Sequence, residues 1–135
     1  GANANFAWGS WLSASNPVIR DIHEYCLVFS KDSMKNSSGG VSTIEKDEFM
    51  ESTLSIWNIN PEKAKKIGHP APFPIELPKK FINLYSFKDD LVLDPFIGSG
   101  TTAIASKLLQ RNYVGYEINK DYIEIANKRL QAETS

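Results

Sequence analysis

The sequence predicts an α/β protein built on a doubly wound, mostly parallel sheet that this chain completes only in part. Apolar runs at residues 91–93 and 113–116 each end at an acidic residue, and the first leads into a glycine turn that opens a helix. A third run, residues 23–29, is largely apolar at both odd and even positions, which predicts a strand covered on both faces. Three strands are too few to complete such a sheet.

The remaining elements follow from local signals along the chain. Residues 31–40 contain Asn-Ser-Ser-Gly-Gly and predict a flexible linker, and the alternation in residues 53–59 predicts an edge strand or an extended loop. The prolines at 74 and 78 are tolerated only near a helix start, so a helix is expected from about residue 75 or 78 to 85. Asn119 is the expected N-cap of a last helix.

The glycine turn after residue 93 predicts a ligand-binding loop. Gly98 and Gly100 let the backbone turn sharply and present unpaired N–H groups of the next helix, while Asp94 and Glu117 flank the loop. Glu117 follows the second strand, where a carboxylate can accept hydrogen bonds from ribose hydroxyls. A tight turn without a ligand is the alternative.

The spacing Gly98-x-Gly100-x-x-Ala103 also fits the dinucleotide fingerprint, so a nicotinamide or flavin enzyme is a second candidate. Asp94 separates the two hypotheses. A carboxylate at the strand end can bind a cationic amine, whereas it would repel a pyrophosphate at the same point.

Four segments together resemble the S-adenosylmethionine-dependent DNA amino-methyltransferases of the permuted β class. Residues 94–102, Asp-Pro-Phe-Ile-Gly-Ser-Gly-Thr-Thr, look like motif I of that family. Residues 69–78 resemble motif X, Glu117 stands at the ribose-binding acid of motif II, and residues 23–31 are similar to motif VIII. The resemblance runs in one order over most of the chain and is more specific than any single motif.

The resemblance implies a Rossmann-like methyltransferase fold, S-adenosyl-L-methionine as cofactor, no metal, and double-stranded DNA as partner, with the target base flipped out of the stack. It assigns Asp94 to the amino group of the methionine part, Glu117 to the ribose and Ile118 to the adenine ring. The complete expected cofactor site is Phe73, Pro74, Leu77, Asp94, Pro95, Phe96, Gly98, Ser99, Gly100, Thr101, Glu117 and Ile118.

The catalytic motif of that family, a Ser, Asp or Asn followed by Pro-Pro and an aromatic residue, does not occur in this sequence. No catalytic residue is therefore assigned in this chain. We expect an N-terminal catalytic segment or a second subunit to supply the motif, with self-association of the chain as a further possibility. A non-catalytic, S-adenosylmethionine-binding regulatory subunit is the alternative.

The resemblance divides the chain into three regions. Residues 1–31 would end the catalytic region with the motif VIII strand, residues 32–68 would form a short linker or target-recognition segment, and residues 69–135 would bind the cofactor. Candidate DNA contacts are Arg20, Trp57, Lys65 and Lys66, although Trp57 between isoleucines is more typical of a core residue. Lys79 and Lys80 are expected to form solvated surface.

Composition limits these hypotheses only weakly. Fifteen Lys and Arg against sixteen Asp and Glu give a net charge of −1, so no global basic field marks a nucleic-acid binder. The single cysteine, Cys26, lies in an apolar run and is expected to be a buried small hydrophobe. No signal peptide or run of membrane length is present, so the default location is the cytoplasm, with no membrane partner.

The target base is a finer question. Many adenine-modifying β-class enzymes have Gln-Lys-Pro in motif X, where this chain has Pro72-Phe73-Pro74. This form resembles the cytosine-N4 enzymes more closely, so cytosine N4 is favoured over adenine N6.

Overall fold

The computed structural model describes residues 22–36, 39–60 and 73–132 of the chain. It divides into two compact units, Gly1–Lys35 and Asn36–Ser135, and each is described here by itself. Arg20, Lys65 and Lys66, three of the four residues predicted to contact DNA, lie outside the described residues.

In the first unit the strand predicted at residues 23–29 is not formed. These residues have no regular secondary structure and their side chains are exposed, including the Cys26 thiol that was predicted to be buried. The only two-stranded sheet among the described residues consists of other segments. A strand is stabilised by hydrogen bonds to a neighbouring strand, so an apolar run without such a neighbour does not form one. The rings of His23 and Tyr25 meet edge to face, with centroids 4.8 Å apart.

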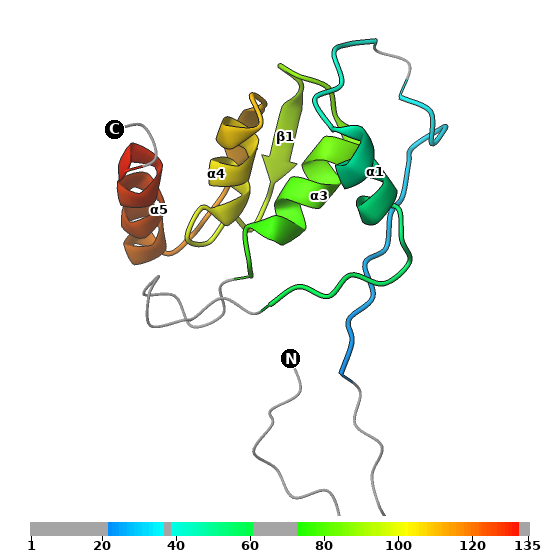
Figure 1. Cartoon of the computed structure of the whole chain (residues 1–135). Coiled ribbons are helices and arrows are strands. Elements are labelled where there is room, and N and C mark those ends of the chain that lie inside the picture. The colour runs from blue at the N-terminus through cyan, green and yellow to red at the C-terminus, as the bar shows by residue number, and fades with distance from the viewer. Residues whose placement is uncertain (1–21, 37–38, 61–72, 133–135) are drawn as a thin grey trace, which may run out of the picture. The chain divides into compact units, whose positions relative to one another are not determined.

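The second unit contains four helices and two strands in the part of it that is described (Figure 1). In chain order they are α1 (Lys46–Ser52), α3 (Glu76–Tyr85), β1 (Leu91–Asp94), α4 (Thr101–Leu108), β2 (Asn112–Gly115) and α5 (Lys120–Ala132). Helix α3 and both strands of the sheet were predicted close to these bounds. Helix α1 was not predicted, and residues 54–60 form a loop and not an edge strand.

Strands β1 and β2 are parallel and are connected through α4. Leu91 pairs with Asn112 and Asp94 with Gly115, so the carboxyl ends of both strands meet at one edge. Two hydrogen bonds continue the pairing beyond the strands, from the Tyr116 N–H to the Asp94 carbonyl and from the Ile97 N–H to the Tyr116 carbonyl, both 3.0 Å. This β-α-β unit is the local arrangement that the sequence predicted.

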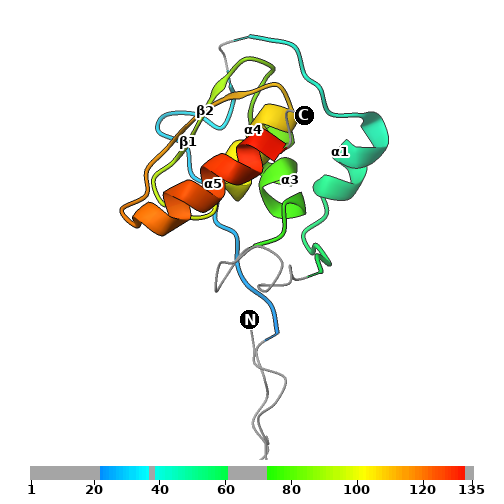
Figure 2. The same ribbon diagram turned by 90° about the vertical axis from the view of Figure 1, so that its left-hand side faces the viewer.

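Helices cover one face of the strand pair. Helix α4 lies between α3 and α5 and contacts both, and α1 contacts α3 (Figures 1 and 2). On β1 the half-buried Val92 and Asp94 alternate with Leu91 and Leu93, which are 66% and 60% exposed. The prediction that residues 91–93 are buried is therefore wrong for alternate side chains, because none of the described helices covers the face on which Leu91 and Leu93 lie.

Buried polar contacts stabilise the end of the sheet at which both strands begin. The side chain of Arg111 is buried just before β2 and donates to the carbonyl oxygens of Leu109 (2.6 Å) and Ser86 (2.7 Å) and to the Thr43 hydroxyl. Desolvation by burial lowers the pKa of Arg111, and the nearby carboxylates of Asp90 and Asp89 partly oppose that effect. Arg111 thus connects the segment before α1, the end of α3 and the start of β2.

A buried lysine attaches α1 to α3. Lys80 was expected on the solvated surface, but its side chain is 8% exposed and its Nζ lies 3.1 Å from Glu51 Oε1 and 3.8 Å from Glu76 Oε1. Trp57 packs edge to face on Phe81, with centroids 5.1 Å apart. The burial of Lys80 therefore results from the contact between α1 and α3, which the residues near Lys80 in the sequence do not predict.

No helix among the described residues is long and apolar enough to cross a membrane.

Candidate functional site

The carboxyl ends of β1 and β2 bring two carboxylates to one edge of the sheet. Asp94 is the last residue of β1, and Glu117 follows β2 by two residues. One Asp94 oxygen accepts a hydrogen bond from the Phe96 N–H at 2.9 Å, which turns the chain into the loop after β1. In open α/β sheets, ligands bind at the carboxyl ends of the strands, so this edge is the candidate site.

Glu117 connects β2 to the glycine loop. Its Oε2 accepts a hydrogen bond from the Gly98 N–H at 3.1 Å, and its Oε1 accepts one from the Asn119 N–H at 2.8 Å. The loop that begins after β1 is therefore fixed to the residue that follows β2. Two donors on separate oxygens hold the carboxylate in one orientation, and a carboxylate oxygen has capacity for further donors.

The glycine loop ends in a left-handed residue that begins α4. Gly100 has a φ of +83°, a conformation that favours glycine, and its carbonyl accepts the first helical hydrogen bond from the Ile104 N–H. The Gly100 N–H itself donates to the Ile97 carbonyl at 2.9 Å. Helix α4 thus begins directly after the loop whose N–H groups at Phe96 and Gly98 donate to Asp94 and Glu117.

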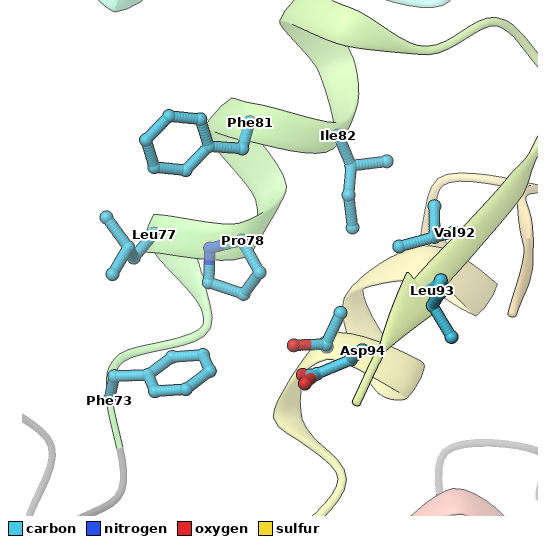
Figure 3. Close-up of a pocket in the computed structure, with 9 residues that line it drawn as sticks. Phe73, Leu77, Pro78, Phe81, Ile82, Val92, Leu93 and Asp94 are labelled. Atoms are coloured by element: carbon cyan, nitrogen blue, oxygen red, sulfur yellow. The ribbon is translucent and has the colours of Figure 1, made fainter. Parts of the chain in front are cut away.

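A cavity of about 290 Å³ lies beside this edge, between α3 and β1 (Figure 3). Its walls are largely apolar, and Asp94 and Thr102 supply the polar atoms at one end. Figure 3 shows Phe73, Leu77 and Phe81 across the cavity from Asp94. The lining residues are Phe73, Leu77, Pro78, Phe81, Ile82, Val92, Leu93, Asp94 and Thr102. An apolar hollow with a carboxylate at one end can accept a ligand that combines apolar surface with a cationic amine.

The structure brings together some of the predicted site residues and leaves others outside the cavity. Phe73, Leu77 and Asp94 line it, whereas Ser99 in the loop and Thr101 at the start of α4 are buried, at 4% and 3% exposure. The cavity lining does not include Pro74, Pro95, Gly98, Gly100 or Glu117.

Two predicted apolar contacts are exposed. Phe96, two residues after β1 ends, is 86% exposed, and Ile118, three residues after β2 ends, is fully exposed. Large exposed apolar side chains at the edge of a candidate site are available to a ligand or to another protein surface.

The candidate DNA contact Trp57 has the environment of a packing residue. Its indole N–H donates to the Ser52 carbonyl at 3.1 Å, its ring packs on Phe81, and it is half-buried. The alternative interpretation of Trp57 as a core residue therefore agrees better with its contacts than a role in base stacking.

Two residues of the site were not found from the sequence. Thr102 lines the cavity, and Arg129 of α5 donates to Ser99 in the glycine loop and to Thr101, the first residue of α4. Thr102 belongs to the motif I run and could have been included from its position. Arg129 is 30 residues from Ser99 in the sequence, and no local pattern connects the two. Among the described residues, no group of three or more His, Cys, Asp or Glu side chains could hold a metal ion.

Comparison with known proteins shows which family the chain resembles. The family of N6- and N4-type DNA methylases matches residues 5–128. Type II methyltransferase M.BglI of Bacillus subtilis is 40% identical over 133 residues, which covers 93% of this chain and 36% of that protein. Type II methyltransferase M.HindIII of Haemophilus influenzae is 34% identical over 147 residues, covering 98% of this chain and 46% of that protein.

Solved structures show the same relationship. Protein TTHA0409 of Thermus thermophilus, solved in complex with S-adenosyl-L-methionine, superposes with a TM-score of 0.59 at 36% identity. The superposition covers 68% of this chain and 35% of that protein. The chain spans between about a third and a half of the length of the curated relatives named above. Its described residues are part of the Rossmann-like α/β fold of these proteins, and the chain belongs to the family of DNA amino-methyltransferases.

Proposed function

We propose that this chain carries the S-adenosyl-L-methionine-binding part of a site-specific DNA methyltransferase. The observation that supports this most directly is the meeting of Asp94, Glu117 and the glycine loop at one edge of the sheet, beside an apolar cavity. The fold neighbour TTHA0409 was solved with the same ligand. A pyrophosphate would meet the Asp94 carboxylate at the strand end, which disfavours a nicotinamide dinucleotide.

The proposed roles follow the positions of the residues. Asp94 would accept hydrogen bonds from the cationic amino group, Glu117 would accept from the ribose hydroxyls, and Phe73 and Leu77 would cover apolar surface. The remaining proposed contacts are Pro74, Pro95, Phe96, Gly98, Ser99, Gly100, Thr101 and Ile118. Ser99 and Thr101 would act through the backbone, because both residues are buried and their hydroxyls contact Arg129.

The ligand supplies a methyl carbon that its sulfonium already activates. The protein therefore has chiefly to bind, orient and exclude water. The methyl group would pass to the exocyclic amino nitrogen of a flipped base, since that nitrogen is not reachable within the stacked duplex. The bond from the methyl carbon to the sulfonium sulfur would break as the bond to nitrogen forms, the demethylated thioether would leave, and the nitrogen would release one proton to solvent. We propose cytosine N4 over adenine N6, on the basis of the Pro72-Phe73-Pro74 run.

Activity would require a segment that carries the Pro-Pro-aromatic motif, because no such tetrapeptide occurs in these 135 residues. The curated relatives named above are between about two and three times as long as the matched region, which leaves room for that segment. It could belong to the same polypeptide or to a second subunit. The role of the segment would be to hold the target base.

Calorimetric titration tests the cofactor proposal. We expect the chain to bind S-adenosyl-L-methionine and its demethylated product and to give no heat with NAD or NADP. Asp94→Asn should weaken the complex with either ligand by about 1–3 kcal/mol, because the charged hydrogen bond to the amino group is lost. Tight dinucleotide binding without any response to the sulfonium compound would refute the proposal.

A non-catalytic binding subunit is the second candidate, favoured by the missing tetrapeptide. The two candidates differ in a methylation assay with labelled cofactor and duplex DNA. If the enzyme hypothesis is correct, the chain alone transfers nothing, and addition of a polypeptide with the Pro-Pro-aromatic motif restores transfer. If such a polypeptide binds but the pair transfers no label, the regulatory candidate is supported.

A further inference from the structure

Helix α5 packs against the glycine loop at Gly100. A Cβ built at Gly100 would lie 2.9 Å from the Cβ and 3.2 Å from the Cα of Ala126, which is itself buried. A side chain at this position would have to displace the helix. The loop and α5 are therefore in direct contact, with no space between them for adjustment.

Arg129, almost one helical turn further along α5, binds the residues on both sides of Gly100. Its Nη1 donates to the Ser99 carbonyl oxygen at 2.6 Å, and it lies 3.0 Å from the Ser99 hydroxyl and 3.2 Å from the Thr101 hydroxyl. These acceptors belong to two buried residues, so the guanidinium satisfies polar groups that are shielded from water.

The peptide unit between Ser99 and Gly100 is held at both ends. Its carbonyl accepts from Arg129, and its N–H donates to the Ile97 carbonyl at 2.9 Å. A peptide unit is planar, so two hydrogen bonds fix its orientation. Without the restraint from Arg129, the permissive backbone of Gly100 would allow this plane to rotate.

We propose that Arg129 is a positioning residue for the cofactor loop. It fixes the peptide planes of residues 99–101, so that the backbone beneath the methionine part of S-adenosyl-L-methionine is already in its binding conformation. This inference rests on the proposed function. Its consequence is selective: Arg129 supports the methionine end of the ligand, whereas the adenosine end depends on Glu117 and Ile118.

Three matched variants test the role of Arg129. Arg129→Met keeps an unbranched apolar stem and removes the donors and the charge, and Arg129→Lys keeps the charge on a shorter stem. Lys128→Met is the control, because the adjacent Lys128 side chain is 78% exposed and its Nζ lies 4.0 Å from Glu124 Oε2, a weak ion pair on the surface. Affinities for S-adenosyl-L-methionine and for adenosine are measured in the full chain by calorimetry.

We expect Arg129→Met to weaken S-adenosyl-L-methionine binding about tenfold or more while adenosine binding changes by less than about twofold. Arg129→Lys should recover part of the loss, and Lys128→Met should show none. Equal losses for both ligands would indicate general damage to the fold and would overturn the inference, as would unchanged affinity for S-adenosyl-L-methionine in both Arg129 variants.

Hydrogen exchange supplies a readout that needs no ligand. Exchange of the Gly100 N–H should be faster in Arg129→Met than in Lys128→Met, while exchange in the middle of α4 is the same in both. If the wild-type chain binds neither S-adenosyl-L-methionine nor its product, the proposed function fails by itself. In that case exchange at Gly100 alone tests the restraint of the loop by Arg129, and equal exchange rates in Arg129→Met and Lys128→Met would contradict it. If Arg129→Met does not fold, Arg129→Lys is used for both measurements.

Discussion

Glu117→Gln is the substitution whose effect the structure specifies most closely. The two carboxylate oxygens of Glu117 each accept a different backbone N–H, from Gly98 at 3.1 Å and from Asn119 at 2.8 Å. Glutamine has one oxygen and one NH₂ group. Whichever way the amide is turned, its NH₂ group faces one of the two N–H donors, so one hydrogen bond is replaced by a repulsive contact between donors.

The size of the effect follows from the loss of one hydrogen bond to a charged group and the weakening of the other. Hydrogen bonds to charged groups contribute about 1.5–3 kcal/mol, and half-burial of Glu117 places the expected loss at the lower end, about 1–2 kcal/mol. The free energy of unfolding should fall by this amount in urea denaturation. Affinity for S-adenosyl-L-methionine should fall as well, because one ribose acceptor is lost.

Glu124→Gln is the matched control for this experiment. Glu124 lies on α5 with a 71% exposed side chain and forms a surface ion pair with Lys128 at 4.0 Å, so its substitution should change stability by less than about 0.5 kcal/mol. If Glu117→Gln unfolds at the same urea concentration as this control and binds the ligand equally well, the proposed link from β2 to the glycine loop does not contribute, and the reasoning is refuted.

Two other substitutions test the support of the site. Gly115→Ala should lower the free energy of unfolding by about 1–3 kcal/mol, because its Cβ would lie 2.9 Å from Ile97 Cβ, and a thermal melt that matches wild type would contradict this packing. Lys80→Met should cost about 1–2 kcal/mol, since Ser52 loses a donor at 3.4 Å and α1 loses its ion pair, while ligand affinity stays within about twofold. Urea denaturation with calorimetry checks both parts, and a large loss of affinity would mean that α1 also supports the site.

The elements that were predicted correctly from the sequence are those specified by residues close to one another along the chain. The helix that ends at residue 85 begins where its prolines allow, and Asn119 caps α5 by accepting from the Asp121 N–H at 2.9 Å. The turn from β1 into α4 follows from its two glycines, which bring positive φ values at Gly98 and Gly100. Each of these features depends on residues that lie within a few positions of one another.

The predictions that failed depended on distant partners. Residues 23–29 have the composition of a strand, but composition does not provide the neighbouring strand that its backbone requires. Lys80 looked like a surface lysine because its partner Glu51 is 29 residues away. The contact of Arg129 with Ser99 was not predicted for the same reason, because the two residues are 30 positions apart. Contacts between distant segments determine the structure and burial of these residues. The pattern of residues within one element does not predict such contacts.

The two sides of the candidate site are supported by different forces, so they should respond differently to substitution. The loop side depends on directional hydrogen bonds from Glu117 and Arg129 to backbone and hydroxyl groups. The cavity side depends on apolar packing by Leu77, Phe81 and Ile82 of α3. A change of charge or hydrogen-bonding capacity should therefore affect the loop, whereas a change of volume should affect the cavity wall.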